Sequence, residues 1–421
     1  MIQEEKTELT EKTELTAGEK VKELQKELTW SFPNIAKEAP SQKEEAFEYC
    51  EAYKAFLDCA KTEREFTQAA VKLLNEAGYA PFEKGRDYKA GDKVYYVNRK
   101  KSLIMTTFGQ REIGAGVRLN VAHIDSPRLD LKPNPMYEKA EMAFLKTHYY
   151  GGIRKYQWAA IPLAMHGVVV KKDGEITDIR IGEEDGDPVF CVTDLLPHLA
   201  ADQNERKLKD GIKGEELNVI IGSLPFTADE DIKEPVKLLA LSVLNEKYGM
   251  TEKDFIRAEI EIVPAFKAVD VGLDRSMVGA YGQDDRVCAY TALTAEMASI
   301  EPEYTTVTVL ADKEEIGSVG NTGLDSDFVL HYIEDLAETA GIDYRTILRN
   351  SICLSSDVNA AYDPTFSQVY EERNACYINK GCVLTKYTGS RGKGGSNDAS
   401  AETMAKIVDM MDREGVYWQI G

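Results

Sequence analysis

Hydrophobic side chains recur at helical spacing in the first part of the chain and then give way to strand-like segments. Apolar positions three and four apart predict two amphipathic helices within residues 41–79, the second ending at Gly78. Residues 93–109 contain two β-rich segments on either side of a charged centre, a pattern that predicts a hairpin. Residues 116–125 predict a buried strand that runs into a loop.

The pattern changes between about residues 129 and 268. Short β-rich segments separated by charged turns occupy this region, at 167–170, 177–182, 188–192 and 216–222. Strands and helices then alternate again, at 304–312, 325–341, 351–357 and 396–415. This alternation predicts an α/β fold, a mostly parallel sheet with helices on both faces, interrupted by a β-rich insertion.

Four regions follow from these patterns. We expect a polar N-terminal extension, a first α/β part, the inserted β-rich domain and a second α/β part, at residues 1–40, 41–128, 129–268 and 269–421. The extension opens with a tandem EKTELT hexapeptide at residues 5–16, which we interpret as a solvated or frayed segment.

Composition narrows the classes of partner. The chain has 421 residues with 43% hydrophobic side chains and a formal net charge of −21, and this acidity argues against nucleic acid and anionic membranes as partners. The 7 cysteines are scattered and form no C-x-x-C pair, which favours a reducing cytoplasm. We see no signal-peptide segment and no apolar stretch long enough to span a membrane.

Four short polar motifs adjoin the apolar segments of the α/β part. They are VAHIDSP, GQDDR, LADKEEIGS and SSDVNAA, at 121–127, 282–286, 310–318 and 355–361. Each alone has an ordinary explanation: a structural histidine, an aspartate pair that caps the next helix, a solvated glutamate turn, or a turn-forming aspartate. Ligands of open α/β sheets gather at the carboxyl ends of strands, so together the four motifs can converge.

The combined set fits a two-zinc hydrolase. Zinc takes imidazole nitrogen and carboxylate oxygen and leaves one position for water. Two metals need a bridging carboxylate and separate terminal ligands. Of two adjacent glutamates, one can bind metal while the other accepts a proton from water and returns it to the leaving amine.

Together with GGSNDAS at 394–400, the four motifs resemble the aspartyl aminopeptidase and aminopeptidase I family of zinc metallopeptidases, over roughly residues 40–421. The resemblance implies a catalytic α/β domain, a β-rich dimerisation domain inserted after the first motif, and peptide substrates. It also implies a homo-oligomer, a dodecamer built from dimers, and two zinc ions per subunit.

The resemblance also assigns roles to single residues. It implies that His123 and Asp357 bind one zinc, with Asp125 orienting His123. Asp284 would bridge the two metals, and Asp285, which follows it, would have a helix-capping or supporting role.

Glu314 resembles the family's general base, and Glu315 resembles a terminal ligand of the second zinc. The reaction so implied removes one residue from a peptide's free N-terminus, with water attacking the scissile carbonyl.

Three further residues are candidate substrate contacts. Tyr156 stands where many family members carry a histidine that reaches into a neighbouring subunit, and a tyrosine hydroxyl can still donate to a developing oxyanion. This departure leaves open whether acidic or neutral N-terminal residues are preferred. Lys386 and Arg391 lie in a glycine-rich basic segment, which is either a flexible loop or a contact to the substrate.

The family's second zinc also takes a histidine near the C-terminus. This sequence has no histidine after His331, which we expect on a helix surface, and it ends at Gly421 where a strand begins. Either the sequence is truncated, the interpretation we favour, or the chain is a degraded relative.

Two other functions therefore stay open. A truncated or inactive relative would serve as an oligomeric assembly protein. A dizinc core with a different substrate would act as a carboxypeptidase or deacylase, and comparing N-blocked with free peptides separates that activity from an aminopeptidase.

Overall fold

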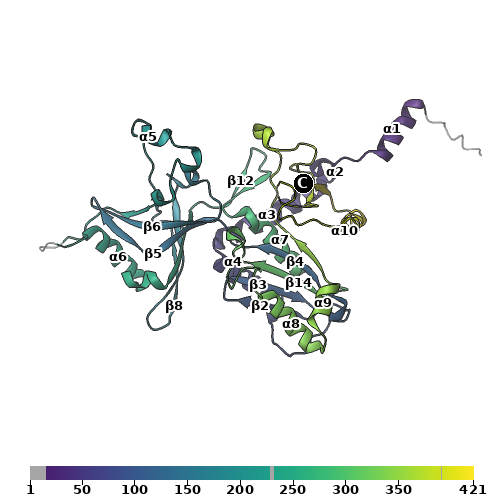
Figure 1. Cartoon of the computed structure of the whole chain (residues 1–421), viewed down its shortest axis with the longest axis horizontal. Helices are drawn as coiled ribbons and strands as arrows, with labels where there is room; N and C mark the ends of the chain where they lie inside the picture. Colours follow the sequence, from purple (N-terminus) through teal and green to yellow (C-terminus); the bar gives the residue numbers. More distant parts are fainter. Residues whose placement is uncertain (1–15, 228–231, 390) are drawn as a thin grey trace, which may run out of the picture. The chain divides into compact units, whose positions relative to one another are not determined.

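The computed structural model describes residues 16–227, 232–389 and 391–421 (Figure 1). The chain divides into two compact units, Glu48–Val358 and a smaller unit formed by Met1–Phe47 with Asn359–Gly421. Of the EKTELT repeat, only Thr16 lies within the described residues. No helix in the described ranges is long and apolar enough to cross a membrane.

A six-stranded mixed sheet, in the order β1-β2-β3-β14-β4-β15, forms one part of the larger unit. Its strands are β1 (Ala80–Pro81), β2 (Lys93–Asn98), β3 (Ser102–Thr107), β4 (Arg118–His123), β14 (Thr306–Ala311) and β15 (Ile352–Ser355). The helices around it are α3 (Lys43–Cys59), α4 (Glu63–Glu76), α7 (Gln283–Ala298), α8 (Phe328–Ala340) and α9 (Tyr344–Asn350). The predicted helices at 41–79 and 325–341 and the predicted hairpin at 93–109 are thereby confirmed.

Strand β3 is buried along its whole length and shows why helices cover both faces of this sheet. Leu103 and Met105 pack with α3, α4 and α7, whereas Ile104 packs with α8 and α9 on the opposite face. Figure 1 shows these helices around the sheet. Successive strand side chains point to opposite faces, so a strand that is buried on both faces has a helical layer on each side.

The prediction of a mostly parallel sheet needs one refinement. The β1–β2, β14–β4 and β4–β15 pairs are parallel, but β3 runs antiparallel to both β2 and β14. The hairpin therefore inserts its second strand into the sheet. The parallel strands β14, β4 and β15 remain neighbours, so their carboxyl ends lie along one edge.

A seven-stranded antiparallel sheet forms the other part of the larger unit, in the order β8-β7-β11-β5-β6-β10-β9. Its strands are β5 (Arg128–Lys139), β6 (Met142–Tyr150), β7 (Leu163–Val170), β8 (Ile176–Ile181), β9 (Cys191–Val192), β10 (Val219–Gly222) and β11 (Ala258–Pro264). Helix α6 (Pro235–Tyr248) contributes Leu244 to the core of this sheet.

The remaining elements of the larger unit are short. They are α5 (Ala201–Asn204), the hairpin β12 (Val269–Val271) and β13 (Met277–Gly279), and the 3-10 helices η2 (Ile113–Ala115), η3 (Lys155–Trp158), η4 (Pro197–Leu199), η5 (Leu208–Asp210), η6 (Gly214–Glu216), η7 (Glu252–Arg257) and η8 (Glu314–Ile316).

The smaller unit has little regular structure. It contains α1 (Ala17–Leu28), α2 (Ile35–Glu38), α10 (Ala401–Arg413), the parallel pair β16 (Cys382–Leu384) and β17 (Trp418–Ile420), and the 3-10 helices η1 (Pro40–Gln42) and η9 (Pro364–Val369). The strand expected at the end of the sequence is β17. Trp30 packs its ring against Trp418, with 4.6 Å between centroids.

Candidate functional site

The polar motifs of the larger unit meet at the carboxyl edge of its parallel strands. His123 is the last residue of β4, and Asp357 follows β15 by two residues. Glu314 and Glu315 are the first two residues of the 3-10 helix η8, which follows β14. Asp284 lies at the start of α7, where its backbone is not helical, with a φ of −88° and a ψ of 106°. This edge is where ligands of α/β sheets are expected.

Three of the predicted ligands form one group. Ligand atoms of His123, Asp284 and Asp357 all lie within 4.8 Å of one another. His123 Nε2 is 3.2 Å from Asp284 Oδ1. The histidine side chain is buried, whereas both aspartates are exposed to solvent, so the group opens outward. One imidazole and two carboxylates are a donor set that suits zinc.

The charges around this group also fit a bound cation. Burial lowers the pKa of His123, but hydrogen bonds with the carboxylates of Asp125 and Asp284 outweigh it and raise the pKa to about 11. Burial and the neighbouring charge of Asp284 raise the pKa of Glu315 to about 7. Crowded carboxylates repel one another, and a divalent cation among them relieves that repulsion.

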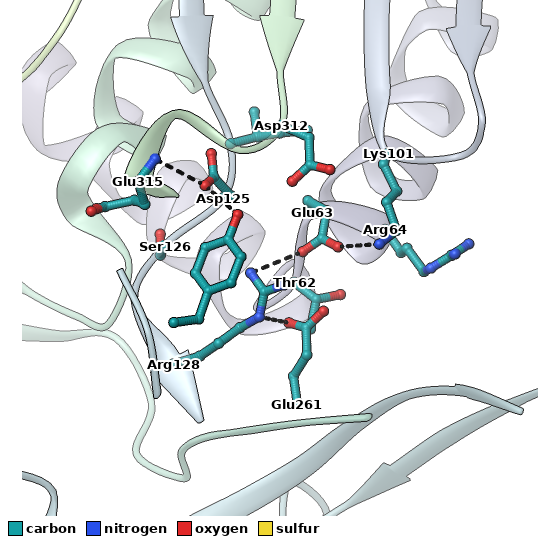
Figure 2. Close-up of polar contacts among 12 residues, drawn as sticks. Thr62, Glu63, Arg64, Lys101, Asp125, Ser126, Arg128, Glu261, Asp312 and Glu315 are labelled. Atoms are coloured by element: carbon teal, nitrogen blue, oxygen red, sulfur yellow. Dashed lines mark hydrogen bonds and ion pairs between the residues drawn. The ribbon is translucent and has the colours of Figure 1, made fainter. Parts of the chain in front are cut away.

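Asp125 lies beneath His123 and is fully buried. His123 Nδ1 is 3.0 Å from the Asp125 backbone carbonyl oxygen and 3.3 Å from carboxylate Oδ1. The backbone carbonyl oxygen and one carboxylate oxygen of Asp125 therefore both face Nδ1 of His123. The other ring nitrogen, Nε2, faces Asp284. Burial raises the pKa of Asp125, but hydrogen bonds from His123, Tyr150 and the Glu315 amide hold it below its usual value. Figure 2 shows the bond from the Glu315 amide to Asp125.

The two glutamates of η8 differ in exposure. The Glu314 side chain is 48% exposed, and its Oε2 lies 3.8 Å from His123 Nε2. Glu315 is half-buried. Lys313 precedes them with a φ of 72° and Gly317 follows with a φ of 95°, so a tight turn carries both side chains. Their backbone amides donate to Asp125 at 3.1 and 3.2 Å.

The capping role considered for Asp285 is wrong. Helix α7 has Gly282 at its N-cap, and no side-chain hydrogen bond caps it. Asp285 is instead fully buried beside the site, where burial raises its pKa to about 7 against a hydrogen bond from Cys288. Ser126 anchors the start of this helix, because its hydroxyl donates to the Asp284 carbonyl at 2.8 Å.

The three candidate substrate contacts belong to other elements of the chain. Tyr156 belongs to η3, is 47% exposed and has the Arg154 guanidinium 5.2 Å from its ring centroid. Lys386 and Arg391 belong to the smaller unit, where Lys386 donates to Asp398 at 3.1 Å and to the Ala399 carbonyl at 2.9 Å.

The other histidines are accounted for individually. His331 is exposed on α8, as expected, and His148 and His198 are also exposed. His166 is fully buried between Glu65 and Glu183. Within the described ranges, no second histidine joins the group of His123, Asp284 and Asp357.

Two residues next to the site were missed by the sequence reasoning. Tyr150 donates a hydrogen bond from its hydroxyl to Asp125 Oδ2 at 2.8 Å, and Arg128 stacks on the Tyr150 ring with 3.8 Å to its centroid. The available signal was the position of Arg128, an arginine one residue after the VAHIDSP motif at the start of a strand.

Comparisons with known proteins identify the family of this chain. The chain matches the family described as Aminopeptidase I zinc metalloprotease (M18) over residues 56–420. A Clostridium acetobutylicum protein named "Probable M18 family aminopeptidase 1" is 49% identical over 387 residues, covering 90% of this chain and 83% of the relative. A Thermotoga maritima protein of the same name is 44% identical over 384 residues, covering 90% and 84%.

Solved structures of similar fold also include aminopeptidases. The crystal structure of an M18 family aminopeptidase from Thermotoga maritima superposes with a TM-score of 0.88 at 42% identity, covering 93% of this chain and 87% of that chain. A structure described as an S. cerevisiae dodecamer shares the fold, with a TM-score of 0.70 at 21% identity, covering 88% of this chain and 84% of that one. The resemblance inferred from the motifs is confirmed. The chain belongs to the M18 family of Aminopeptidase I zinc metalloproteases, and it is an aminopeptidase of that family.

Proposed function

We propose that this aminopeptidase removes single N-terminal residues from peptides at the carboxyl edge of its six-stranded sheet. The observation that carries the proposal is the group of His123, Asp284 and Asp357, whose ligand atoms lie within 4.8 Å of one another. A zinc ion bound there supplies a Lewis acid that polarises the scissile carbonyl and lowers the pKa of water.

The protein's own side chains then have distinct tasks. Glu314 is close to His123 yet half exposed, so its carboxylate can accept a proton from the attacking water and return it to the leaving amine. Asp125 holds the His123 ring by its Nδ1 face, which keeps Nε2 available as the ligand atom. Asp284 and Glu315 are the ligands that the chain offers to a second zinc ion.

Substrate selection and assembly complete the proposal. We assign Tyr156, Lys386 and Arg391 as candidate substrate contacts, by resemblance to the family. The relative solved as a dodecamer supports a homo-oligomer, a dodecamer built from dimers. The seven free cysteines support a cytoplasmic location, where thiols stay reduced.

The test uses the purified full chain. We expect zinc analysis to find at least one ion per chain, and His123→Ala to lose it. Glu314→Gln should keep its zinc and lose activity on aminoacyl-4-nitroanilides by about 10²–10⁴-fold, because the proton acceptor is gone. Glu334→Gln, an exposed glutamate of α8, is the matched control and should retain full activity.

Three outcomes would contradict the proposal. Full activity in Glu314→Gln would remove the general base. Equal cleavage of free and N-acetylated substrates would show that the free amine is not recognised, which favours deacylase or carboxypeptidase chemistry. A large zinc-free particle without any hydrolysis would instead indicate the assembly protein.

A further inference from the structure

The residue pair at the start of β5 and the end of β6 lies next to the candidate zinc site. Arg128 of β5 and Tyr150 of β6 are opposite one another in the register of this sheet. Both side chains are buried, at 5% and 8% exposure. Arg128 follows His123 by only five residues, so the strand leaves the site and immediately enters the second sheet.

Tyr150 contacts the site through Asp125. Its hydroxyl donates to Asp125 Oδ2 at 2.8 Å, and the carboxylate also accepts the amides of Glu314 and Glu315. The two amides belong to η8, which follows β14 of the six-stranded sheet. Tyr150 belongs to β6 of the seven-stranded sheet. Three donors from two parts of the unit therefore fix the carboxylate that faces His123 Nδ1.

Arg128 fixes Tyr150 in turn. Its guanidinium stacks on the Tyr150 ring, and its nitrogens lie 3.4 Å from Glu63, 3.2 Å from Glu261 and 2.8 Å from Asp130. Figure 2 shows the contacts of Arg128 with Glu63 and Glu261. These carboxylates belong to α4, β11 and β5 respectively. Carboxylates from three elements thereby hold the planar guanidinium in one orientation. The ammonium group of a lysine has no such plane and would not be oriented in this way.

Two of the three carboxylates around Arg128, those of Glu63 and Glu261, are buried with it. Glu63 is fully buried and also lies 3.2 Å from Lys101 (Figure 2). Burial opposes ionisation of Glu63, but Arg128 and Lys101 hold its pKa below the usual value. Burial instead raises the pKa of Glu261 well above its usual value, against the charge of Arg128. Breaking a buried pair of this kind is strongly unfavourable.

A second contact joins the same strand end to the site. Gly151 follows Tyr150 with a φ of 74°, and a Cβ at this position would lie 3.2 Å from Glu315 Cβ and 3.3 Å from Pro127 Cγ. The end of β6 therefore packs against a candidate metal ligand as well as bonding to Asp125.

We propose that Tyr150 is a positioning residue: held by Arg128, it orients Asp125 and so sets the geometry with which His123 binds metal. The inserted sheet is then part of the zinc site's support and not a separate assembly module. This inference rests on the proposed function, because it takes His123 as a zinc ligand. Residues that orient a ligand imidazole typically change metal affinity by about 10–100-fold when they are removed.

The test is Tyr150→Phe, which keeps the ring beneath Arg128 and removes only the hydroxyl. We expect the zinc dissociation constant, measured by chelator competition on the full chain, to rise about 10–100-fold. The visible spectrum of the Co²⁺-substituted protein should also shift. The metal-free variant should remain folded but unfold at a lower urea concentration than wild type, because the buried Asp125 carboxylate loses one donor. The control is Tyr149→Phe, at a residue that is 38% exposed and stacks on His148, and it should keep wild-type stability and zinc affinity.

Arg128→Lys tests the other half of the proposal. It keeps a positive charge for Glu63 but loses the planar face that stacks on Tyr150, so zinc affinity should fall here too. Zinc affinity and a Co²⁺ spectrum equal to wild type in Tyr150→Phe would overturn the inference. If wild type and His123→Ala bind zinc equally, the proposed function itself fails, so the two failures are distinguishable.

Discussion

Asp125 shows how much of the site depends on one buried carboxylate. It receives a hydroxyl and two backbone amides and faces the Nδ1 side of His123, so the imidazole has one free nitrogen. A metal-binding histidine needs its other ring nitrogen held in this way, since the second partner decides which tautomer binds the ion.

Replacing Asp125 by asparagine should separate its charge from its size. Asp125→Asn keeps the shape but removes the negative charge opposite His123 Nδ1, so we expect zinc affinity to fall about 10–100-fold. Chelator competition measures the change, and Asp178→Asn, an exposed aspartate of β8, is the control. Unchanged affinity would show that the Asp125 backbone carbonyl alone orients the ring.

Single residues also show what the sequence could and could not predict. His123, Asp284 and Asp357 could be predicted because each adjoins an apolar element, and the ends of parallel strands meet. Tyr150 could not be, because its contact with Asp125 depends on the pairing register of β5 with β6. Asp285 was misread because the start of α7 is not helical, so its carboxylate meets no free amide.

At the scale of elements, apolar periodicity predicted the helices and strands, but not the order of the strands. Strand β3 is buried on both faces, which is typical of a central strand. Its place between β2 and β14 depends on pairing with a strand about 200 residues away, as in the pair Thr107 and Thr306. Local pattern contains no information about such a partner, so the hairpin was predicted but the pairing of its second strand with β14 was not.

The close approach of β4 to β15 gives a prediction at this scale. Gly116 precedes β4 with a φ of 91°, and a Cβ there would lie 2.2 Å from the Asn350 carbonyl oxygen. Gly174 has a nearly equal φ of 89° but open space around it. Both alanine variants incur backbone strain of about 1–2 kcal/mol, and Gly116→Ala should lose a further 1–3 kcal/mol, roughly, from overpacking.

Urea unfolding followed by circular dichroism measures the difference between the two variants. Equal midpoints for Gly116→Ala and Gly174→Ala would mean that the backbone before β15 moves aside without loss of stability.

At the scale of the larger unit, a second buried group joins the two sheets. His166 of β7 lies between Glu65 of α4, at 2.8 Å, and Glu183, at 3.0 Å. Lys61 contacts the same Glu183 oxygen at 2.7 Å, and Lys267 lies 3.5 Å from its other oxygen. Burial lowers the pKa of His166, but the hydrogen bonds to Glu183 and Glu65 raise it above its usual value.

This arrangement predicts a stability that depends on pH. Because the folded pKa of His166 exceeds 6.5, its contribution is complete below that pH and is lost as pH rises through the folded value. The pKa of Glu183 is below 4.5, so its contribution is lost as pH falls through that lower value. His166→Gln should therefore destabilise by about 3 kcal/mol near pH 6 and by less near pH 9.

Urea midpoints at the two pH values check this prediction, with His148→Gln, an exposed histidine, as the control. A loss of stability that is the same at both pH values would mean that His166 acts by shape alone.

The large separation of the ligands along the chain has a consequence for how the enzyme acquires its metal. His123 and Asp284 are 161 residues apart, with the whole seven-stranded sheet between them. Contacts of such high sequence separation form late, because the intervening chain must first be ordered. During synthesis, His123 leaves the ribosome long before Asp284 and Asp357 do. Unlike a zinc finger, whose nearby ligands let the ion drive folding, this site is expected to capture zinc only after both sheets have formed.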